Sequence, residues 1–209
     1  MNIAVLVSGG GTNLQALIDN EKKQGTNCAY HIVCVLSDRK SAFALERAKK
    51  ANIPTEIVSS YSILGKASAK ILTTNQKRIV ISQRCLEHCK TYKADAIVLA
   101  GFLTVLSGSI IQEYSNRIIN LHPALLPKFG GEGMWGENVH KAVIAAGEKE
   151  SGCTIHLVDD GCDTGRILLQ KKVPVLSNDT PKTLYERIAP VEHEAMVEGV
   201  VLLAKEFDS

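Results

Sequence analysis

The sequence contains six cysteines but no Cys-X-X-Cys pair. Cys85 and Cys89 are one helical turn apart, so their sulfurs could share a metal, but no histidine or second cysteine pair completes a tetrahedral set. We therefore interpret both as small buried thiols and expect no metal site. Unpaired cysteines without a secretion signal are typical of a reducing compartment, so we expect a cytoplasmic location.

A signal peptide, a membrane span and a strong charge imbalance are also lacking. Met1 leads directly into an apolar stretch with no basic segment before it, which is unlike a signal peptide. No apolar run approaches the length of a membrane span. The 24 basic and 22 acidic residues are interspersed and give a net charge of +2, so we expect neither nucleic acid nor membrane as a partner. A small anionic ligand needs only a local site.

What the sequence does contain is an alternation of apolar strands and amphipathic helices. Residues 2–8 form a continuous apolar run that ends in glycine, as a strand buried on both faces does. Similar patterns predict strands over residues 31–36, 55–58 and 94–99, and helices over 42–50 and 66–90. The long helix is expected to bury Ile71, Ile79, Ile81, Cys85 and Leu86. This order predicts an α/β fold with a doubly wound, mostly parallel sheet.

The sequence changes character after Pro127. Residues 128–138 are rich in glycine and predict a mobile loop, followed by a helix over 139–146. Strands over 154–158 and 167–175 flank an acidic turn and predict an antiparallel hairpin at one edge of the sheet. A long terminal helix begins with Thr180 as its cap and Pro181 at its first position, and Pro190 predicts a kink or a restart. We expect a single domain over residues 1–209.

A glycine-rich turn, Gly9–Asn13, follows the first predicted strand and precedes a helix. Glycines let backbone N–H groups approach a phosphate, and the helix dipole favours its negative charge. The turn has neither the spacing of the dinucleotide fingerprint nor the lysine of a P-loop. A tight strand-to-helix connection that binds nothing is the alternative, but the position after the first strand favours a phosphate site.

The stretch from Arg117 to Pro127 carries the first candidates for chemistry. Its apolar residues predict a buried strand that Pro123 ends, so Asn120 and His122 point to the same face at the strand's end. An amide and an imidazole directed together could donate hydrogen bonds to a carbonyl oxygen that becomes negative. The alternative is a polar pair that only caps the turn at Pro123.

The acidic turn, residues 159–165, carries the second candidate. Asp163 lies between two glycines, and a carboxylate beside an imidazole raises the pKa of the imidazole and keeps it charged. Asp159 and Asp160 are interpreted as turn formers, and the spacing of a calcium-binding EF-hand is missing. We interpret His156 and the remaining histidines as ordinary residues, with His140 a weaker candidate for ligand contact. The serine before the glycine turn lacks the context of a nucleophile elbow, so a reaction here would be a direct transfer.

Four motifs together carry a resemblance that extends over essentially the whole chain. They are Gly-Gly-Gly-Thr-Asn-Leu-Gln at residues 9–15, Leu-Ala-Gly-Phe-Leu at 99–103, Asn-Leu-His-Pro-Ala-Leu-Leu-Pro at 120–127, and the segment 152–165 that ends in Asp-Asp-Gly-Cys-Asp-Thr-Gly. The chain resembles the folate-dependent phosphoribosylglycinamide formyltransferases. Methionyl-tRNA formyltransferases and formyltetrahydrofolate hydrolases look similar around His122 but carry an extra domain, for which this chain has no room.

The resemblance implies a set of site residues. Asn120, His122 and Asp163 would be catalytic, 10-formyltetrahydrofolate would be the co-substrate, and the amine of 5-phosphoribosylglycinamide would attack its formyl carbon. The ribonucleotide would be bound by Gly11, Thr12, Asn13, Gly101, Pro123 and Glu192. Folate would be bound by Arg78, Leu103, Thr104, Val105, Leu106, Asn120, Val158 and Asp160. Residues 1–100 would form a nucleotide-phosphate-binding half and residues 101–209 a catalytic and folate-binding half.

The sequence also departs from the family pattern. Ala189 stands where the family often has a lysine or glutamine near the phosphate, and Thr104 stands where some members have an arginine near the pterin. Leu157 and Cys162 replace more usual residues around Asp163. A folate hydrolase and a non-catalytic nucleotide-binding regulator remain the alternative functions, and monomer and homodimer remain open. Glycine hinges around Met134 and Trp135 predict that the loop from Gly130 to Gly136 closes over folate.

Overall fold

The computed structural model describes residues 1–207 of the chain. The strands are β1 (Asn2–Val7), β2 (His31–Ser37), β3 (Thr55–Ile57), β4 (Ala96–Leu99), β5 (Ile118–His122), β6 (Glu150–Leu157) and β7 (Ile167–Pro174). The helices are α1 (Thr12–Gln24), α2 (Phe43–Lys50), α3 (Ser60–Ile71), α4 (Thr74–Thr91), α5 (Ser109–Glu113), α6 (Glu137–Ala145) and α7 (Pro181–Phe207), and a 3-10 turn, η1, covers Gly25–Asn27.

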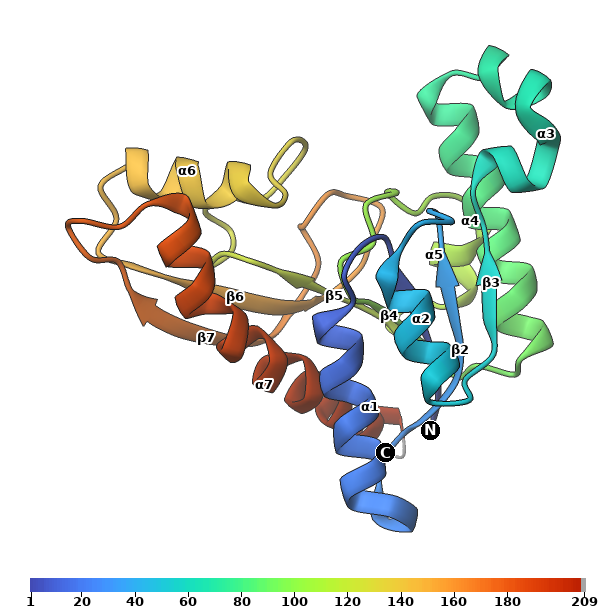
Figure 1. Ribbon diagram of the computed structural model, residues 1–209, viewed down its shortest axis with the longest axis horizontal. Coiled ribbons are helices and arrows are strands. Elements are labelled where there is room, and N and C mark those ends of the chain that lie inside the picture. The colour runs from blue at the N-terminus through green and yellow to red at the C-terminus, as the bar shows by residue number, and fades with distance from the viewer. Residues whose placement is uncertain (208–209) are drawn as a thin grey trace.

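The strands form one seven-stranded sheet in the order β3-β2-β1-β4-β5-β6-β7 (Figure 1). The strands from β3 to β5 pair in parallel, whereas β6 pairs antiparallel with both β5 and β7. The predicted doubly wound, mostly parallel sheet with an antiparallel hairpin is therefore confirmed. In residues 1–207 no helix has the length and apolar character needed to cross a bilayer.

Both faces of the sheet are covered, as the continuous apolar strands predict. In β1, Ile3, Val5 and Val7 pack on the side of α1, α2 and α7, while Ala4 and Leu6 pack on the side of α4 and α5. All five side chains are completely buried. This alternation follows from the two-residue period of a strand, and it holds the ends of the central strands rigidly in place.

The single long helix predicted over residues 66–90 is wrong. The chain breaks between α3 and α4, and α3 projects from the body of the molecule together with the first part of α4 (Figure 1). Thr73 and Gln76 form a capping box at the start of α4, since each side chain accepts the other's backbone N–H, at 3.2 and 2.9 Å. Ile71 is 83% exposed and Ile79 is 53% exposed, so the predicted buried side is confirmed only from Ile81 onward.

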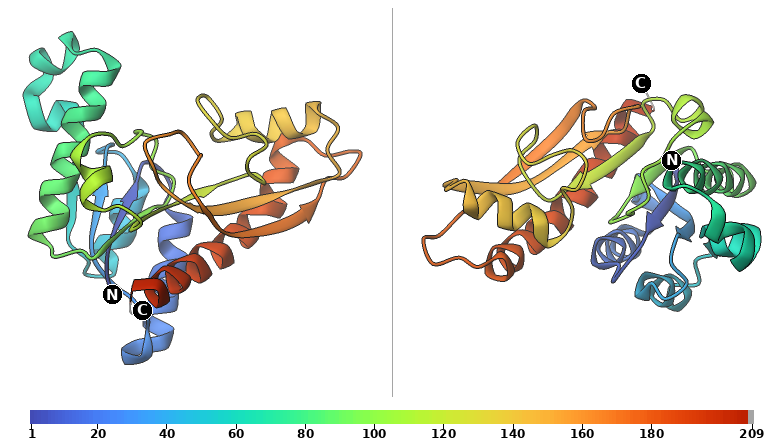
Figure 2. Two further views of the ribbon diagram at one scale, coloured as in Figure 1. Left: turned by 180° about the vertical axis from the view of Figure 1, so that it is seen from behind. Right: turned by 90° about the horizontal axis from the view of Figure 1, so that it is seen from above.

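The terminal helix begins as predicted, because the hydroxyl of Thr180 accepts the N–H of Thr183 at 3.2 Å. It then runs from Pro181 to Phe207 as one element, so the alternative of a restart at Pro190 is wrong. Its axis changes direction in both Figure 1 and Figure 2, in agreement with the predicted kink. Packing of α7 along α1, β6 and β7 keeps the helix continuous despite the missing N–H.

The sheet order brings three distant segments to one place. β1 lies between β2 and β4, so the chain winds away in opposite directions on its two sides, and ligands in such sheets bind at this crevice. The glycine turn follows β1, Gly101 follows β4, and Pro123 follows β5. Asn13 of the glycine turn, Gly101 and Pro123 all line one cavity.

Candidate active site

The cavity has a volume of about 880 Å³ and extends from the ends of β1, β4 and β5 to the glycine-rich loop and the start of α7. It is large enough for a drug-sized ligand. The residues predicted to be catalytic, Asn120, His122 and Asp163, all line it. The first two come from β5, and Asp163 comes from the turn between β6 and β7.

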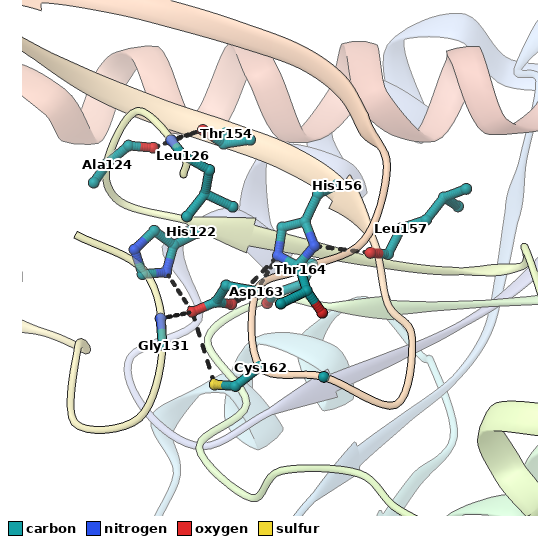
Figure 3. Close-up of polar contacts among 12 residues, drawn as sticks. His122, Ala124, Leu126, Gly131, Thr154, His156, Leu157, Cys162, Asp163 and Thr164 are labelled. Atoms are coloured by element: carbon teal, nitrogen blue, oxygen red, sulfur yellow. Dashed lines mark hydrogen bonds and ion pairs between the residues drawn. The ribbon is translucent and has the colours of Figure 1, made fainter. Parts of the chain in front are cut away.

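His122 is held by both of its ring nitrogens. Nδ1 lies 3.5 Å from Oδ2 of Asp163, and Nε2 lies 2.8 Å from the carbonyl oxygen of Phe129, the residue before the glycine hinges (Figure 3 shows the pair with Asp163). Both neighbours are acceptors, so the arrangement best satisfies a ring that carries a proton on each nitrogen. The side chain is only 4% exposed.

The pKa predicted for His122 is wrong in direction. Burial lowers the pKa of this imidazole below its ordinary value, and the Asp163 carboxylate and the Phe129 carbonyl oppose the shift only in part. The sequence indicated a carboxylate partner but not the depth at which the ring is buried. Asp163 therefore favours the protonated ring, but burial has the larger effect on the pKa.

Asp163 is the centre of a network of polar contacts (Figure 3). It adopts a left-handed backbone with φ of 59°, and its Oδ2 accepts the N–H of Gly131 at 3.0 Å. Burial raises the pKa of this carboxyl, but contacts with His156, Gly131 and His122 outweigh burial and lower it below the ordinary value. Asp163 is therefore ionised at neutral pH.

Asp159 shapes the turn that carries Asp163, as predicted. Its Oδ1 accepts the N–H of Gly161 at 3.0 Å and the hydroxyl of Thr164 at 2.6 Å. These contacts fold the turn back on itself and direct Asp163 inward.

His156 is the residue of this network that sequence reasoning missed. It lies directly opposite Asn120 in the β5–β6 register, and its Nε2 is 3.1 Å from Asn120 Nδ2 and 3.4 Å from Asp163 Oδ1. Its Nδ1 lies 2.8 Å from the carbonyl oxygen of Leu157, and its Nε2 faces both the Asn120 amide and the Asp163 carboxylate. No signal in the sequence gave the register of these two strands, so His156 read as an ordinary mid-strand residue.

Among the residues expected to bind the ribonucleotide, Asn13 and Glu192 meet although they are far apart in the chain. Asn13 Nδ2 donates to Glu192 Oε2 at 3.4 Å, and both side chains are buried and line the cavity. Burial raises the pKa of Glu192 to about 7, although the bond from Asn13 opposes this. Gly101 and Pro123 line the same cavity, whereas Gly11 and Thr12 lie just outside its lining.

Most of the residues expected to bind folate line the cavity, namely Arg78, Leu103, Thr104, Val105, Leu106, Asn120 and Val158. Asp160 does not: it is exposed and lies outside the lining. Arg78 Nη2 forms an ion pair with Glu132 of the glycine-rich loop at 3.1 Å. The Thr104 hydroxyl donates to Asp38 Oδ2 at 2.7 Å, so this donor already has a partner within the chain.

The glycine-rich loop reaches into the site. Gly131, Met134 and Trp135 line the cavity, and Trp135 is 56% exposed. His140 also lines it, which agrees with its place as a weaker candidate, and its Nδ1 is buried without a hydrogen-bond partner in the described residues.

Within residues 1–207, no group of three or more histidine, cysteine or acidic side chains is placed to hold a metal ion.

Comparisons with known proteins agree with this arrangement. Residues 1–200 match the family model described as formyl transferase. The chain is 41% identical over 202 residues to the trifunctional purine biosynthetic protein adenosine-3 of Drosophila pseudoobscura pseudoobscura, with 97% of the chain and 14% of the relative covered. It is 35% identical to the chloroplastic phosphoribosylglycinamide formyltransferase of Arabidopsis thaliana, with 98% of the chain and 65% of the relative covered. The chain thus spans a small part of the trifunctional relatives and about two thirds of the plant relative.

Solved structures are similar along nearly the whole chain. Glycinamide ribonucleotide transformylase 1 from Symbiobacterium toebii superimposes with a TM-score of 0.84 at 33% identity, covering 99% of this chain and 88% of the other. Phosphoribosylglycinamide formyltransferase from Brucella melitensis superimposes with a TM-score of 0.80 at 34% identity, covering 97% and 95%.

Proposed function

Because the chain belongs to the formyl transferase family, we propose that it transfers the formyl group of 10-formyltetrahydrofolate to the amine of 5-phosphoribosylglycinamide in purine biosynthesis. The product is N-formylglycinamide ribonucleotide. The relatives named for this activity are similar to the chain over almost all of its length, and both substrates are small molecules.

One observation carries the proposal: Asn120, His122 and Asp163 meet at a cavity that is also lined by Asn13 and Glu192. The first group suits the chemistry of a formyl carbonyl, and the second suits the hydroxyls and phosphate of a ribonucleotide. The boundary between a phosphate half, residues 1–100, and a folate half, residues 101–209, is not strict in this proposal. Arg78 would bind folate from the first half, and Glu192 would bind ribose from the second.

The reaction is a direct transfer between the two substrates. The substrate amine forms a bond to the formyl carbon, and the carbonyl electron pair moves to the formyl oxygen. The bond from carbon to N10 of the folate then breaks as the carbonyl reforms, while the amine loses a proton and N10 gains one through water. Asn120 and His122 donate to the negative oxygen of the intermediate, and Asp163 stabilises the imidazolium form of His122.

The ring of His122 must exchange one partner for this role. Its Nε2 lies against the carbonyl of Phe129, so the formyl oxygen can receive this N–H only after that carbonyl moves away. Phe129 precedes the glycine hinges, and Gly131 donates its N–H to Asp163. We therefore propose that movement of the loop from Gly130 to Gly136 on folate binding both closes the cavity and releases the His122 N–H.

A spectroscopic formyl-transfer assay with both substrates, and with each omitted in turn, tests the proposal. His122→Ala and Asp163→Asn should each lower the rate roughly a hundredfold or more while the melting temperature stays near that of the wild type. His31→Ala, which removes an exposed histidine far from the cavity, should leave the rate unchanged. Deformylation of folate without the ribonucleotide would instead identify a hydrolase, and folate binding without any transfer would identify a regulator.

A further inference from the structure

The back of the glycine turn is covered by α2. The N–H of Ala44 donates to the carbonyl of Gly9 at 3.0 Å, and Nε of Arg47 donates to the carbonyl of Gly10 at 2.8 Å. A Cβ atom on Gly11 would lie 2.5 Å from the Cβ of Ala44, so this glycine allows the close approach of the helix. Two successive carbonyls of the turn are therefore held toward α2.

The geometry of the peptide bond then fixes the direction of two N–H groups. In a trans peptide the N–H points opposite to the carbonyl of the same unit, and the only cis bond in residues 1–207 is Leu126–Pro127. The N–H groups of Gly10 and Gly11 consequently point away from α2. Gly9 and Gly10 are exposed, and a Cβ on either residue would meet no atom within 4 Å. These donors are available to an anion in front of the turn.

Arg47 is held firmly behind the turn. Besides the bond to Gly10, its Nη1 donates to Oε1 of Gln15 at 3.1 Å, and its Cζ lies 5.1 Å from the ring centroid of Phe43. No carboxylate in residues 1–207 forms an ion pair with it. Its positive charge is therefore not neutralised locally, and it adds to the positive end of α1.

The ligand side of the turn shows an unused polar group. Asn13 is 9% exposed, and its Oδ1 is buried without a hydrogen-bond partner in the described residues although the side chain lines the cavity. On α7, Ala189 contributes no charge. Burial lowers the pKa of His193, one turn further along α7, and the charge of Arg47 lowers it further, so the field of Arg47 extends to this helix.

We propose that Arg47 is a positioning residue for the phosphate of the ribonucleotide, which it binds through the turn rather than by direct contact. Arg47 fixes the Gly10 carbonyl so that the Gly11 N–H faces the phosphate, and it supplies from behind the turn the positive charge that Ala189 does not supply. This inference rests on the proposed function, since that function places a phosphate at this site.

Steady-state kinetics of Arg47→Ala, Arg47→Lys and Lys50→Ala test the proposal. Lys50 is the matched control, because it is an exposed cation in the last turn of the same helix. Arg47→Ala should raise KM for the ribonucleotide roughly ten- to a hundredfold, the range for loss of a charge-assisted hydrogen bond, with kcat and KM for folate within about twofold. Arg47→Lys keeps the charge and should recover part of the loss, and Lys50→Ala should match the wild type.

The same variants are then compared on the phosphate-free substrate, glycinamide riboside. Arg47→Ala should lose little further activity on it, because the missing interaction involves the phosphate. An unchanged KM for the ribonucleotide, or an equal loss on both substrates, would overturn the proposal. If Arg47→Ala does not fold, Arg47→Lys and Gln15→Met, which removes the second acceptor of the guanidinium, give the same comparison.

Failure of the proposed function can be told apart from failure of this inference. A wild-type protein without formyl transfer would refute the function alone. Binding of inorganic phosphate, followed by ³¹P NMR, would still distinguish wild type from Arg47→Ala. Equal phosphate affinity in the two proteins would refute the role of Arg47.

Discussion

Glu192 should make the protein less stable as the pH rises through neutrality. Its pKa is raised from the ordinary 4.5 to about 7, mainly by burial. Between these values the folded protein holds a proton that the unfolded chain has released, so the free energy of unfolding falls as the pH rises. At 1.36 kcal/mol for each pH unit, the loss in the free energy of unfolding is about 3 kcal/mol in total. The loss is complete above pH 7 and absent below pH 4.5.

The variant Glu192→Gln isolates this contribution, because an amide of the same shape does not ionise. Urea unfolding at pH 5 and pH 8 should show that the wild type loses about 2–3 kcal/mol more than the variant over this interval. Glu194→Gln is the matched control, because this carboxylate lies on the same helix with 72% of its side chain exposed, and it should behave as the wild type. The same pH dependence in wild type and Glu192→Gln would refute the assignment.

Ionisation of Glu192 should also affect binding of the ribonucleotide. A carboxylate accepts hydrogen bonds from ribose hydroxyls better than the neutral acid does. KM for the ribonucleotide should therefore rise as the pH falls below about 7 in the wild type. In Glu192→Gln it should be high at every pH. A variant that is more stable at pH 8 yet binds the ribonucleotide less well would show that the buried carboxylate is retained for binding.

Two further predictions concern the residues around the cavity. His156→Ala should lower kcat roughly two- to tenfold with little change in KM for the ribonucleotide, since it removes the partner of the Asn120 amide at 3.1 Å and leaves only the longer contact with Asp163 at 3.5 Å, and a typical hydrogen bond contributes about 0.5–1.5 kcal/mol. His156→Gln, which can keep an acceptor there, should recover part of the rate, and equal rates for wild type and His156→Ala would contradict the positioning role. Glu132→Gln should increase affinity for the folate tail by no more than about fivefold, because the ion pair with Arg78 is exposed on the Glu132 side and such pairs contribute about 0–1 kcal/mol. Trp135 fluorescence measures this binding, and a signal unchanged at saturation with a folate analogue would count against closure of the loop.

Local patterns predicted most of the fold because the local and global preferences of this chain agree. The apolar run of β1 is buried on both faces, Thr180 and Pro181 begin α7, and the hairpin after the glycine-rich loop forms as predicted. The error over residues 66–90 arose where two signals competed. Apolar spacing favoured one helix, but the capping box at Thr73 was the stronger determinant.

The candidate site was predictable to the extent that it follows strand ends. Asn120 and His122 lie where a proline stops a buried strand, and the sheet order places the glycine turn beside them. Asp163 was predictable as a partner of His122, whose Nδ1 lies 3.5 Å away. The network around these residues was not, because it depends on contacts between segments that are distant in the chain.

The sequence by itself determined which elements form, in which order, and which side chains stand at the ends of the strands, because these properties depend on neighbours within a few residues. Only the tertiary structure decided that His156 supports Asn120, that burial lowers the pKa of His122, and that Arg47 holds the back of the glycine turn. Strand register, depth of burial and the contact of α2 with Gly10 are set by packing across the whole sheet, which no local pattern specifies.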